Sequence, residues 1–401
     1  MQISDVKIPY YSSDILRRWK RRDSCKLISG LDISFLREPP VCEFHVTPPP
    51  PPTPVEKPDR VIAFLDGLQK VHDFLHEPPK KRPPPPPKPA KQVKIPPFDL
   101  QEIPGAMRAV NMPVAAQLME RWFAGGLNYS PTNEHEGKLI NQDGKPYPPS
   151  MYEMSLVKLD WVLKFERARE GYERLLSREV LSSPLAIATL RTMIEPFRRP
   201  DRQIFPRHLT GNSLAELHKH FQFQYSPVEG SMRQKIAQFM HREYAYRGLP
   251  DDLTGALGSF NFYVAPESVV FSWDGCDAEI RTVIVYVKDN YTFGDKPGQV
   301  SQYLGHWNRS GVIIVPYSAA LSALNWHREP PGDVVPLPEE AGLYADFPVA
   351  VADPRTRGNV YHPVYNSTYR KWQITHKRGG DFVIFSDSRT IKLVPPIKVR
   401  F

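Results

Sequence analysis

The chain has 401 residues and a formal net charge of +8, because 52 Lys and Arg residues outnumber 44 Asp and Glu residues. This length allows two or three domains, and the mildly basic charge is compatible with an anionic partner. The three cysteines, Cys25, Cys42 and Cys276, have no CxxC spacing, which excludes a disulfide framework and argues against a zinc site. So few cysteines fit synthesis in a reducing cytoplasm.

Residues 1–98 read as a proline-rich, largely disordered arm. Proline blocks at 47–54 and 78–89 favour polyproline II and act as semi-rigid spacers. Between them, apolar residues of the segment 60–75 recur at helical spacing and predict a short amphipathic helix. The helix could dock on a carrier or pack on the main body. Much of the positive charge sits near the prolines, so we favour a solvated tail over a nucleic-acid patch.

The beginning of the chain has no apolar signal-peptide core, and no window approaches 18 consecutive apolar residues. The sequence therefore predicts neither a secretory signal peptide nor a transmembrane helix. Synthesis in the cytoplasm is expected, and a dedicated machine would have to carry the protein out of the cell.

Residues 99–250 predict a helical region. A helix starts near Pro104, the segment 114–123 is strongly helical, and Gly125-Gly126 stops it. Ser150 resembles the N-cap of a long helix that reaches about Leu176. Further helices are predicted over 183–196, 213–223 and 230–246.

Residues 251–401 predict a mostly antiparallel sheet. Alternating or β-branched runs occur at 258–264, 267–273, 279–288, 311–316, 347–351, 381–386 and 390–396. The fold class is therefore α+β, with a helical region beside a β-rich domain.

The first candidate site lies where the run 279–288 ends in polar residues. Asp289 and Tyr291 follow this run, and His306 and Arg309 come after a glycine-containing loop. A carboxylate, a phenol, an imidazole and a guanidinium could hold a metal-bound phosphate and move protons. The same residues are also ordinary turn and core residues, and this alternative stays open.

The second candidate site is the turn Gly379-Gly380-Asp381 before a predicted strand. Two glycines could allow the backbone to approach an anion. A hairpin turn with a solvated Asp381 is the structural alternative. The histidines His208, His218, His220 and His241 are not spaced as metal ligands on one helical face, so we do not assign a metal site to them.

Several landmarks occur in order along residues 98–397, namely Pro113–Phe123, Gly258–Tyr263, Tyr286–Phe293, Gln302–Trp307, Asn366–Trp372 and Gly379–Asp387. In this order they resemble a bacterial family of unknown function. Proteins of that family tend to be encoded near type VI secretion spike proteins. The resemblance implies an antibacterial effector with a cognate immunity protein. A spike or chaperone protein would then be the partner of the proline-rich arm.

Asp289-x-Tyr291 after a strand is also similar to the signature of colicin M-type toxins, which cleave a lipid-linked peptidoglycan precursor with a divalent cation. In this chain Thr292 stands where that signature has a second Asp, and no His-Arg pair follows at the expected distance. The resemblance implies that Asp289 binds a cation such as Mg²⁺ or acts as a base. It further implies that Tyr291 orients a phosphate, and we assign protonation of the leaving group to His306.

Three functions follow as hypotheses. The first is an envelope-directed toxin of the phosphodiesterase or hydrolase type. The second is a non-enzymatic secretion adaptor or membrane-perturbing protein. Nucleic-acid binding through residues 1–98 ranks last, because no folded surface combines basic and aromatic residues.

Overall fold

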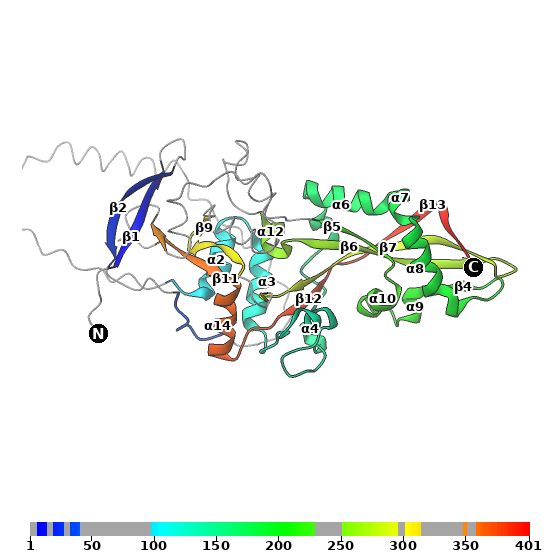
Figure 1. Cartoon of the computed structure of the whole chain (residues 1–401), viewed down its shortest axis with the longest axis horizontal. Helices are drawn as coiled ribbons and strands as arrows, with labels where there is room; N and C mark the ends of the chain where they lie inside the picture. The colour runs from blue at the N-terminus through cyan, green and yellow to red at the C-terminus, as the bar shows by residue number, and fades with distance from the viewer. Residues whose placement is uncertain are drawn as a thin grey trace, which may run out of the picture. The chain divides into compact units, whose positions relative to one another are not determined.

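The computed structural model describes residues 6–13, 19–27, 33–40, 98–228, 251–295, 301–313, 348–350 and 358–401. All of them belong to one compact unit, which comprises residues 1–41 and 95–401. Helices gather over roughly 100–220 and the β-rich part follows, which confirms the α+β class (Figure 1). The proline blocks and the helices predicted over 60–75 and 230–246 lie outside the described residues.

A seven-stranded sheet forms the centre of the unit. Its order is β3-β12-β7-β6-β4, with β13 also paired to β7 and β5 also paired to β6. The long hairpin of β6 (Phe260–Phe271) and β7 (Asp277–Tyr291) forms its middle. The other strands are β3 (Tyr152–Glu153), β4 (Gln203–Ile204), β5 (Gln224–Val228), β12 (Phe382–Phe385) and β13 (Arg389–Arg400). Only β3 and β12 pair in parallel here.

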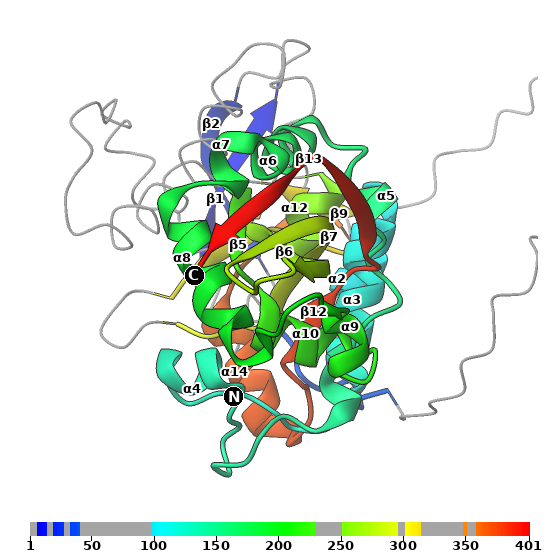
Figure 2. The same ribbon diagram turned by 90° about the vertical axis from the view of Figure 1, so that its right-hand side faces the viewer.

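Helices cover both faces of this sheet (Figure 2). Val283, Val285 and Val287 of β7 face a core that includes residues of α6 (Glu166–Leu176) and α8 (Pro184–Ile194). Alternate residues of the same strand, Ile284 and Tyr286, face a second core with α10 (Leu214–Phe221). Because both faces are buried in its middle, β7 is continuously apolar from Val283 to Val287 instead of alternating with polar residues.

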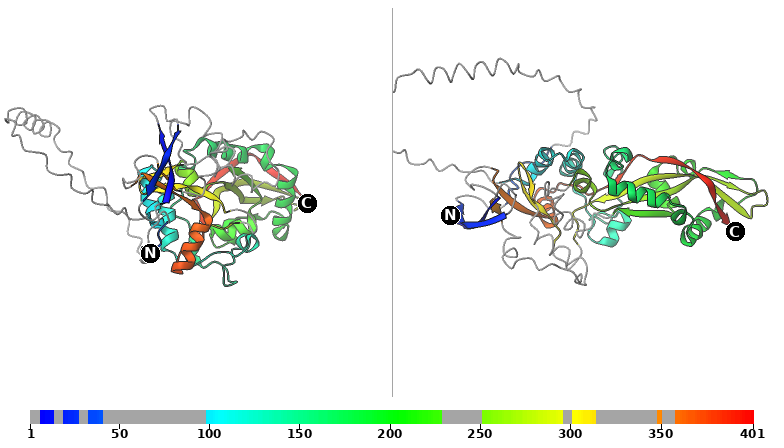
Figure 3. Two further views of the ribbon diagram at one scale, coloured as in Figure 1. Left: turned by 60° about the vertical axis from the view of Figure 1, so that its left-hand side comes forward. Right: turned by 90° about the horizontal axis from the view of Figure 1, so that it is seen from above.

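A six-stranded sheet has the order β2-β1-β10-β11-β8-β9. It consists of β1 (Val6–Ser13), β2 (Trp19–Leu27), β8 (Tyr303–Asn308), β9 (Gly311–Ile313), β10 (Val349–Ala350) and β11 (Val360–Tyr365). Two strands from the beginning of the chain thus join strands from its last third. The views in Figure 3 show β1 and β2 beside β10 and β11.

The remaining helices connect and brace the sheets. They are η1 (Leu100–Glu102), α2 (Ile103–Ala109), α3 (Pro113–Ala124), α4 (Asn133–Lys138), η2 (Pro149–Met151), α5 (Leu159–Val162), α7 (Arg178–Leu181), η3 (Glu195–Phe197), α9 (Pro206–Leu209), α12 (Asp252–Leu257) and α14 (Asn366–His376). Within the described ranges, no helix is both long and apolar enough to cross a membrane.

Several sequence predictions are confirmed at the level of single elements. The helix predicted to stop at Gly125-Gly126 is α3, which ends at Ala124. Ser183 and Ser213 accept backbone N–H groups at the starts of α8 and α10, as good N-caps do.

The long helix predicted from Ser150 to Leu176 is wrong. The Glu153 carboxylate accepts the backbone N–H groups of Ser155 and Leu156, and Asp387 accepts that of Leu159. These side chains bind donors that a helix would otherwise use, so the segment divides into η2, β3, α5 and α6.

The predicted strands at 258–264 and 267–273 are one strand, β6, whose register shifts near Pro266. The strand predicted at 279–288 extends to Tyr291, and residues 303–308, for which no strand was predicted, form β8. The polar end of β7 is therefore paired, and Asp289 lies opposite Ile384 of β12.

Candidate functional site

Tyr291, one of the predicted catalytic residues, is a core residue. Its side chain is 7% exposed, its ring stacks on Phe382 at 4.9 Å, and its hydroxyl donates to Sδ of Met119 at 3.7 Å. Burial raises the pKa of Tyr291 far above its usual value. Such a phenol stabilises the packing between β7, β12 and α3, and it does not face a phosphate in solution.

His306 lies in the other sheet, on β8, opposite Pro363 of β11. It is fully buried, and its Nδ1 bonds the hydroxyl of Tyr303 at 2.5 Å. Asp289 belongs to β7 of the seven-stranded sheet, whereas His306 belongs to the six-stranded sheet. The three predicted catalytic residues therefore do not form one constellation.

Asp289 keeps properties that suit a functional residue. It is half-buried near the end of β7, and burial raises its pKa to about 7, although Lys288 and the backbone N–H of Asn290 oppose this shift. Alternation along the strand places it on the face of Val287 and Tyr291, whereas Lys288 and Asn290 lie on the opposite face. A carboxyl group with a pKa near 7 can exchange a proton at neutral pH.

Three tyrosines lie in register across the sheet on the face that carries Lys288. Tyr225 of β5 pairs with Tyr263 of β6, and Tyr263 pairs with Tyr286 of β7. Exposure falls along this row, because Tyr225 is 53% exposed, Tyr263 is half-buried and Tyr286 is fully buried. Burial raises the pKa of Tyr263 and of Tyr286, so both phenols stay protonated at neutral pH.

His218 of α10 lies beside this row of tyrosines. Its Nδ1 is 3.0 Å from the hydroxyl of Tyr286, and its ring meets that of Tyr263 edge-on at 4.7 Å. Burial, with a contribution from the positive charge of Lys288, lowers the pKa of His218 to about 4. The imidazole is consequently neutral at pH 7, and burial disfavours its protonation.

Lys288 continues the same face toward α4. Its ammonium donates to Oδ1 of Asn290 at 2.9 Å, and Nδ2 of Asn290 donates to Glu136 at 3.3 Å. Burial lowers the pKa of Lys288, while Asp289 and Glu136 oppose the shift. We call the set His218, Tyr263, Tyr286, Lys288, Asn290 and Glu136 the Lys288 face.

The predicted binding residue Asp381 lies in a different cluster, just before β12. Its side chain is 1% exposed, and its carboxylate accepts from Nε1 of Trp122 at 2.9 Å and from Thr292 at 2.8 Å. Arg370 of α14 forms an ion pair with the same carboxylate at 2.8 Å. Asp381, Trp122, Thr292 and Arg370 form what we call the Asp381 network. The expectation of a solvated Asp381 in a hairpin turn is therefore wrong.

Gly379 and Gly380 bring the backbone of this turn close to the end of α3, and no anion is needed to explain them. The N–H of Gly380 donates to the carbonyl of Trp122 at 3.0 Å, and the N–H of Gly379 donates to that of Gly125 at 3.0 Å. A Cβ at position 380 would lie 2.8 Å from the carbonyl oxygen of Gly126. Only glycine allows this approach without a shift.

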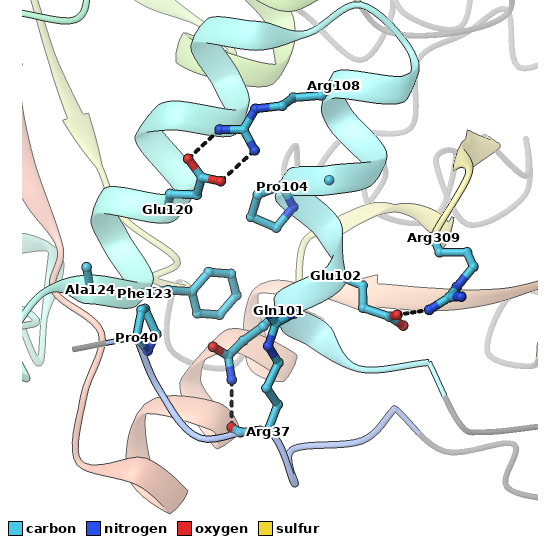
Figure 4. Close-up of a pocket in the computed structure, with 11 residues that line it drawn as sticks. Arg37, Pro40, Gln101, Glu102, Pro104, Arg108, Glu120, Phe123, Ala124 and Arg309 are labelled. Carbon is cyan, nitrogen blue, oxygen red and sulfur yellow. Dashed lines mark hydrogen bonds and ion pairs between the residues drawn. The ribbon is translucent and has the colours of Figure 1, made fainter. Parts of the chain in front are cut away.

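Arg309 lies in the turn after β8 and pairs with Glu102 at the rim of a pocket (Figure 4). The pocket is formed by α2, α3 and the segment 33–40, and it contains neither Asp289 nor Asp381. The predicted catalytic and binding residues are thus distributed over the side of β7 opposite the Lys288 face, the Asp381 network and its glycine turn, the buried strand β8 and this pocket.

A divalent cation at Asp289 does not fit the side chains around it. Within the part of the chain that the structure describes, no three His, Cys, Asp or Glu residues are grouped so that they could hold a metal ion. Hard cations such as Mg²⁺ prefer several oxygen ligands. We therefore assign no chemical step to a metal.

The sequence analysis missed Lys288, Glu136 and the role of His218. Lys288 directly follows the apolar run 283–287 and is the first polar residue at its end, and this was the available signal. His218 and Glu136 are 70 and 152 residues away from Lys288, and only the pairing of strands and helices brings them near.

Comparison with known proteins identifies the family. Residues 98–401 match the model of a family of unknown function, DUF6402, which covers more than half of the chain. The chain belongs to this family. No curated protein and no solved structure matches it. The predicted resemblance to a family of unknown function is confirmed, and the match carries no information on activity.

Proposed function

We propose that this member of DUF6402 is a type VI secretion-associated antibacterial effector that acts on the bacterial envelope, with the Lys288 face as its working surface. The delivery route rests on the resemblance described above. A lipid-linked phosphate is the target class that we consider first.

One observation carries the assignment to the Lys288 face. His218, Tyr263 and Lys288 all have pKa values displaced from their ordinary range, and all three are half-buried. Clusters of displaced pKa values on partly open surfaces are typical of functional sites. In the Asp381 network, by contrast, the buried carboxylate is matched by a guanidinium.

The arrangement supports binding of an anion and of the charge that develops on it. Lys288 would bind a phosphate oxygen, because its ammonium is held by the neutral amide of Asn290 and forms no ion pair within the described residues. His218 is neutral at pH 7 and would take part through a hydrogen bond from its imidazole, since burial disfavours its protonated form. The phenol of Tyr263 would donate a hydrogen bond to the developing charge.

The test is growth of bacteria that express the full chain either in the cytoplasm or, with an added signal peptide, in the periplasm. We expect killing from the periplasm only. His218→Gln and Lys288→Met should each reduce killing by at least 100-fold, as expected for loss of a positioned hydrogen-bonding group or an electrostatic contact.

His220→Gln is the matched control, because His220 lies on the same helix and forms an exposed pair with Glu216. This variant should kill as the wild type does. Full toxicity of folded Lys288→Met and His218→Gln proteins would refute the assignment, and killing from the cytoplasm alone would refute the envelope target.

A second candidate function is a non-enzymatic secretion adaptor. The observation that favours it is that Asp289 and His306 lie in different sheets. An adaptor predicts no killing from either compartment. It also predicts that the purified chain co-elutes with a spike protein and that removal of the proline-rich residues 42–94 abolishes this binding.

A further inference from the structure

A pocket of about 580 Å³ lies away from the Lys288 face, between α2, α3, the β8–β9 turn and the segment 33–40. Its wall includes the apolar groups of Pro40, Pro104, Phe123 and Ala124. The polar part of the lining consists of three arginines, two glutamates and Gln101.

Two of the three arginines are neutralised within the pocket. Arg108 forms a two-pronged ion pair with Glu120, which joins α2 to α3, and Arg309 pairs with Glu102 (Figure 4). Planar guanidinium groups match carboxylates in this way, so these pairs fix the walls of the pocket.

The third arginine, Arg37, has no carboxylate. Among the described residues, its guanidinium makes no ion pair or hydrogen bond. Figure 4 shows its side chain directed into the pocket alongside Gln101. With three guanidinium groups and two carboxylates, the lining carries one uncompensated positive charge, and Arg37 provides it.

The backbone around Arg37 is held in place before any ligand binds. Its carbonyl accepts from Nε2 of Gln101 at 2.7 Å, and its N–H donates to Asp99 at 3.3 Å. The N–H of Ser34 donates to the carbonyl of Phe98 at 2.8 Å, and the carbonyl of Ser34 accepts from the N–H of Leu100 at 3.2 Å. A binding group on a fixed backbone loses less conformational freedom when it captures a ligand.

From these contacts we infer that the pocket binds a small organic carboxylate, whose charged group pairs with Arg37 and whose apolar part lies against Pro104 and Phe123. A single negative charge matches the single free positive charge. A phosphate dianion would meet the repulsion of Glu102 and Glu120, and a nucleic acid would need a larger positive surface.

The segment 33–40 lies outside the range that matches the family model, residues 98–401. The family domain therefore supplies most of the wall, and a segment that precedes it supplies the free charge. This site is independent of the proposed toxin activity, since it shares no residue with the Lys288 face.

The experiment is calorimetric or ligand-observed NMR titration of the full chain with benzoate, its neutral analogue benzamide, and inorganic phosphate. Benzoate should bind saturably with a Kd on the order of 1 mM or below, as expected for a fragment-sized ligand. Benzamide and phosphate should each bind at least 10-fold more weakly.

The variants Arg37→Gln and Arg37→Lys separate charge from geometry. Arg37→Gln should lose at least 10-fold in benzoate affinity, and Arg37→Lys should lose less, because it keeps the charge without the planar fork. Arg191→Gln is the matched control, since Arg191 is exposed on α8 and lies far along the chain from the pocket lining.

Circular dichroism and thermal unfolding must show that all variants fold as the wild type does, which is expected because the Arg37 side chain is exposed. Equal benzoate affinity in Arg37→Gln and the wild type would overturn the proposal. Absence of saturable benzoate binding, or tighter binding of phosphate than of benzoate, would overturn it as well.

Discussion

The Lys288 face and the Asp381 network lie near the same end of β7, yet their polar groups are paired to very different degrees. In the Asp381 network one buried carboxylate meets an indole N–H, a hydroxyl and a guanidinium. On the Lys288 face, the pKa values of His218 and Lys288 are displaced, and the Lys288 ammonium donates to the neutral amide of Asn290. Buried polar groups with matched partners stabilise a fold, whereas half-buried groups with displaced pKa values are typical of sites that bind or react.

The largest effect is expected from Asp381→Asn. This change removes the negative charge that compensates Arg370 and weakens the hydrogen bond from Trp122. Breaking one side of a buried ion pair should lower the free energy of unfolding by about 3–5 kcal/mol. Urea unfolding of the full chain, followed by far-UV circular dichroism, measures the loss.

Asp143→Asn is the control for Asp381→Asn, because Asp143 is exposed. Its free energy of unfolding should stay within about 0.5 kcal/mol of the wild type. Equal stability of the two variants would mean that the Asp381 network does not stabilise the fold, and the contrast with the Lys288 face would disappear.

The next effect concerns pH. The pKa of His218 is about 4 in the folded protein, whereas an unfolded histidine titrates near 6.5. Between pH 6.5 and pH 4, His218 is protonated in the unfolded chain but stays neutral in the folded protein. The contribution of His218 to the free energy of unfolding should therefore be complete above pH 6.5. It should fall by at most about 3 kcal/mol as the pH drops to 4.

His218→Gln cannot titrate, so its loss of stability over this pH range should be smaller than that of the wild type. Thermal unfolding at intervals between pH 4 and pH 7 provides the comparison. His220→Gln should keep the wild-type profile, since His220 is exposed. If His218→Gln and the wild type share one profile, the imidazole is not held neutral by burial.

The fold was more predictable from the sequence than the site. Helices α3, α8 and α10 carry local signals, namely a glycine stop or a serine cap, and their predictions were confirmed. The helix predicted from Ser150 failed, because Glu153 and Asp387 bind backbone donors that a local pattern does not reveal. Apolar runs predicted β6 and β7, but the pairing of β12 with β7 was needed to show that Asp289 lies inside a strand.

The candidate site depends on contacts between distant segments, which periodicity does not encode. Asp289 could be selected as a polar residue after an apolar run, and it retains a displaced pKa. Tyr291 and His306 were selected on the same grounds, but strand alternation and sheet membership place both in the core. Thr292 was considered an inadequate replacement for a carboxylate, whereas the fold brings the carboxylate of Asp381 to it.

A third prediction tests how tightly the Gly379-Gly380 turn is packed. In Gly380→Ala the new Cβ would lie 2.8 Å from the carbonyl oxygen of Gly126 and 2.9 Å from Cε of Met151. Met151 can move but the carbonyl is backbone, so a destabilisation of about 1–3 kcal/mol is expected. Thermal unfolding measures it.

Gly137→Ala is the matched control, because no atom lies within 4 Å of a Cβ added at this position in α4. Alanine favours a helix over glycine, so this variant should be as stable as the wild type or more stable by up to about 1 kcal/mol. A neutral Gly380→Ala would mean that the turn is loose enough to move toward a ligand, as the anion-binding hypothesis for this turn requires.

The smallest effect is expected from Thr292→Val. This change removes the hydroxyl that donates to Asp381 and accepts from the Gly294 N–H and from Arg370. The Asp381 carboxylate keeps Trp122 and Arg370, so the loss should be about 1–2 kcal/mol. Thr292→Ser retains the hydroxyl and should be closer to the wild type.

Thr292→Asp would restore the second carboxylate of the colicin M-type signature, yet it would place that carboxylate against a buried one. It should therefore destabilise the fold more than Thr292→Val does. Urea unfolding of the three variants gives the order. If Thr292→Asp is instead as stable as the wild type, this corner of the molecule accommodates two carboxylates, and the distinction between a structural Asp381 network and a chemical Lys288 face is wrong.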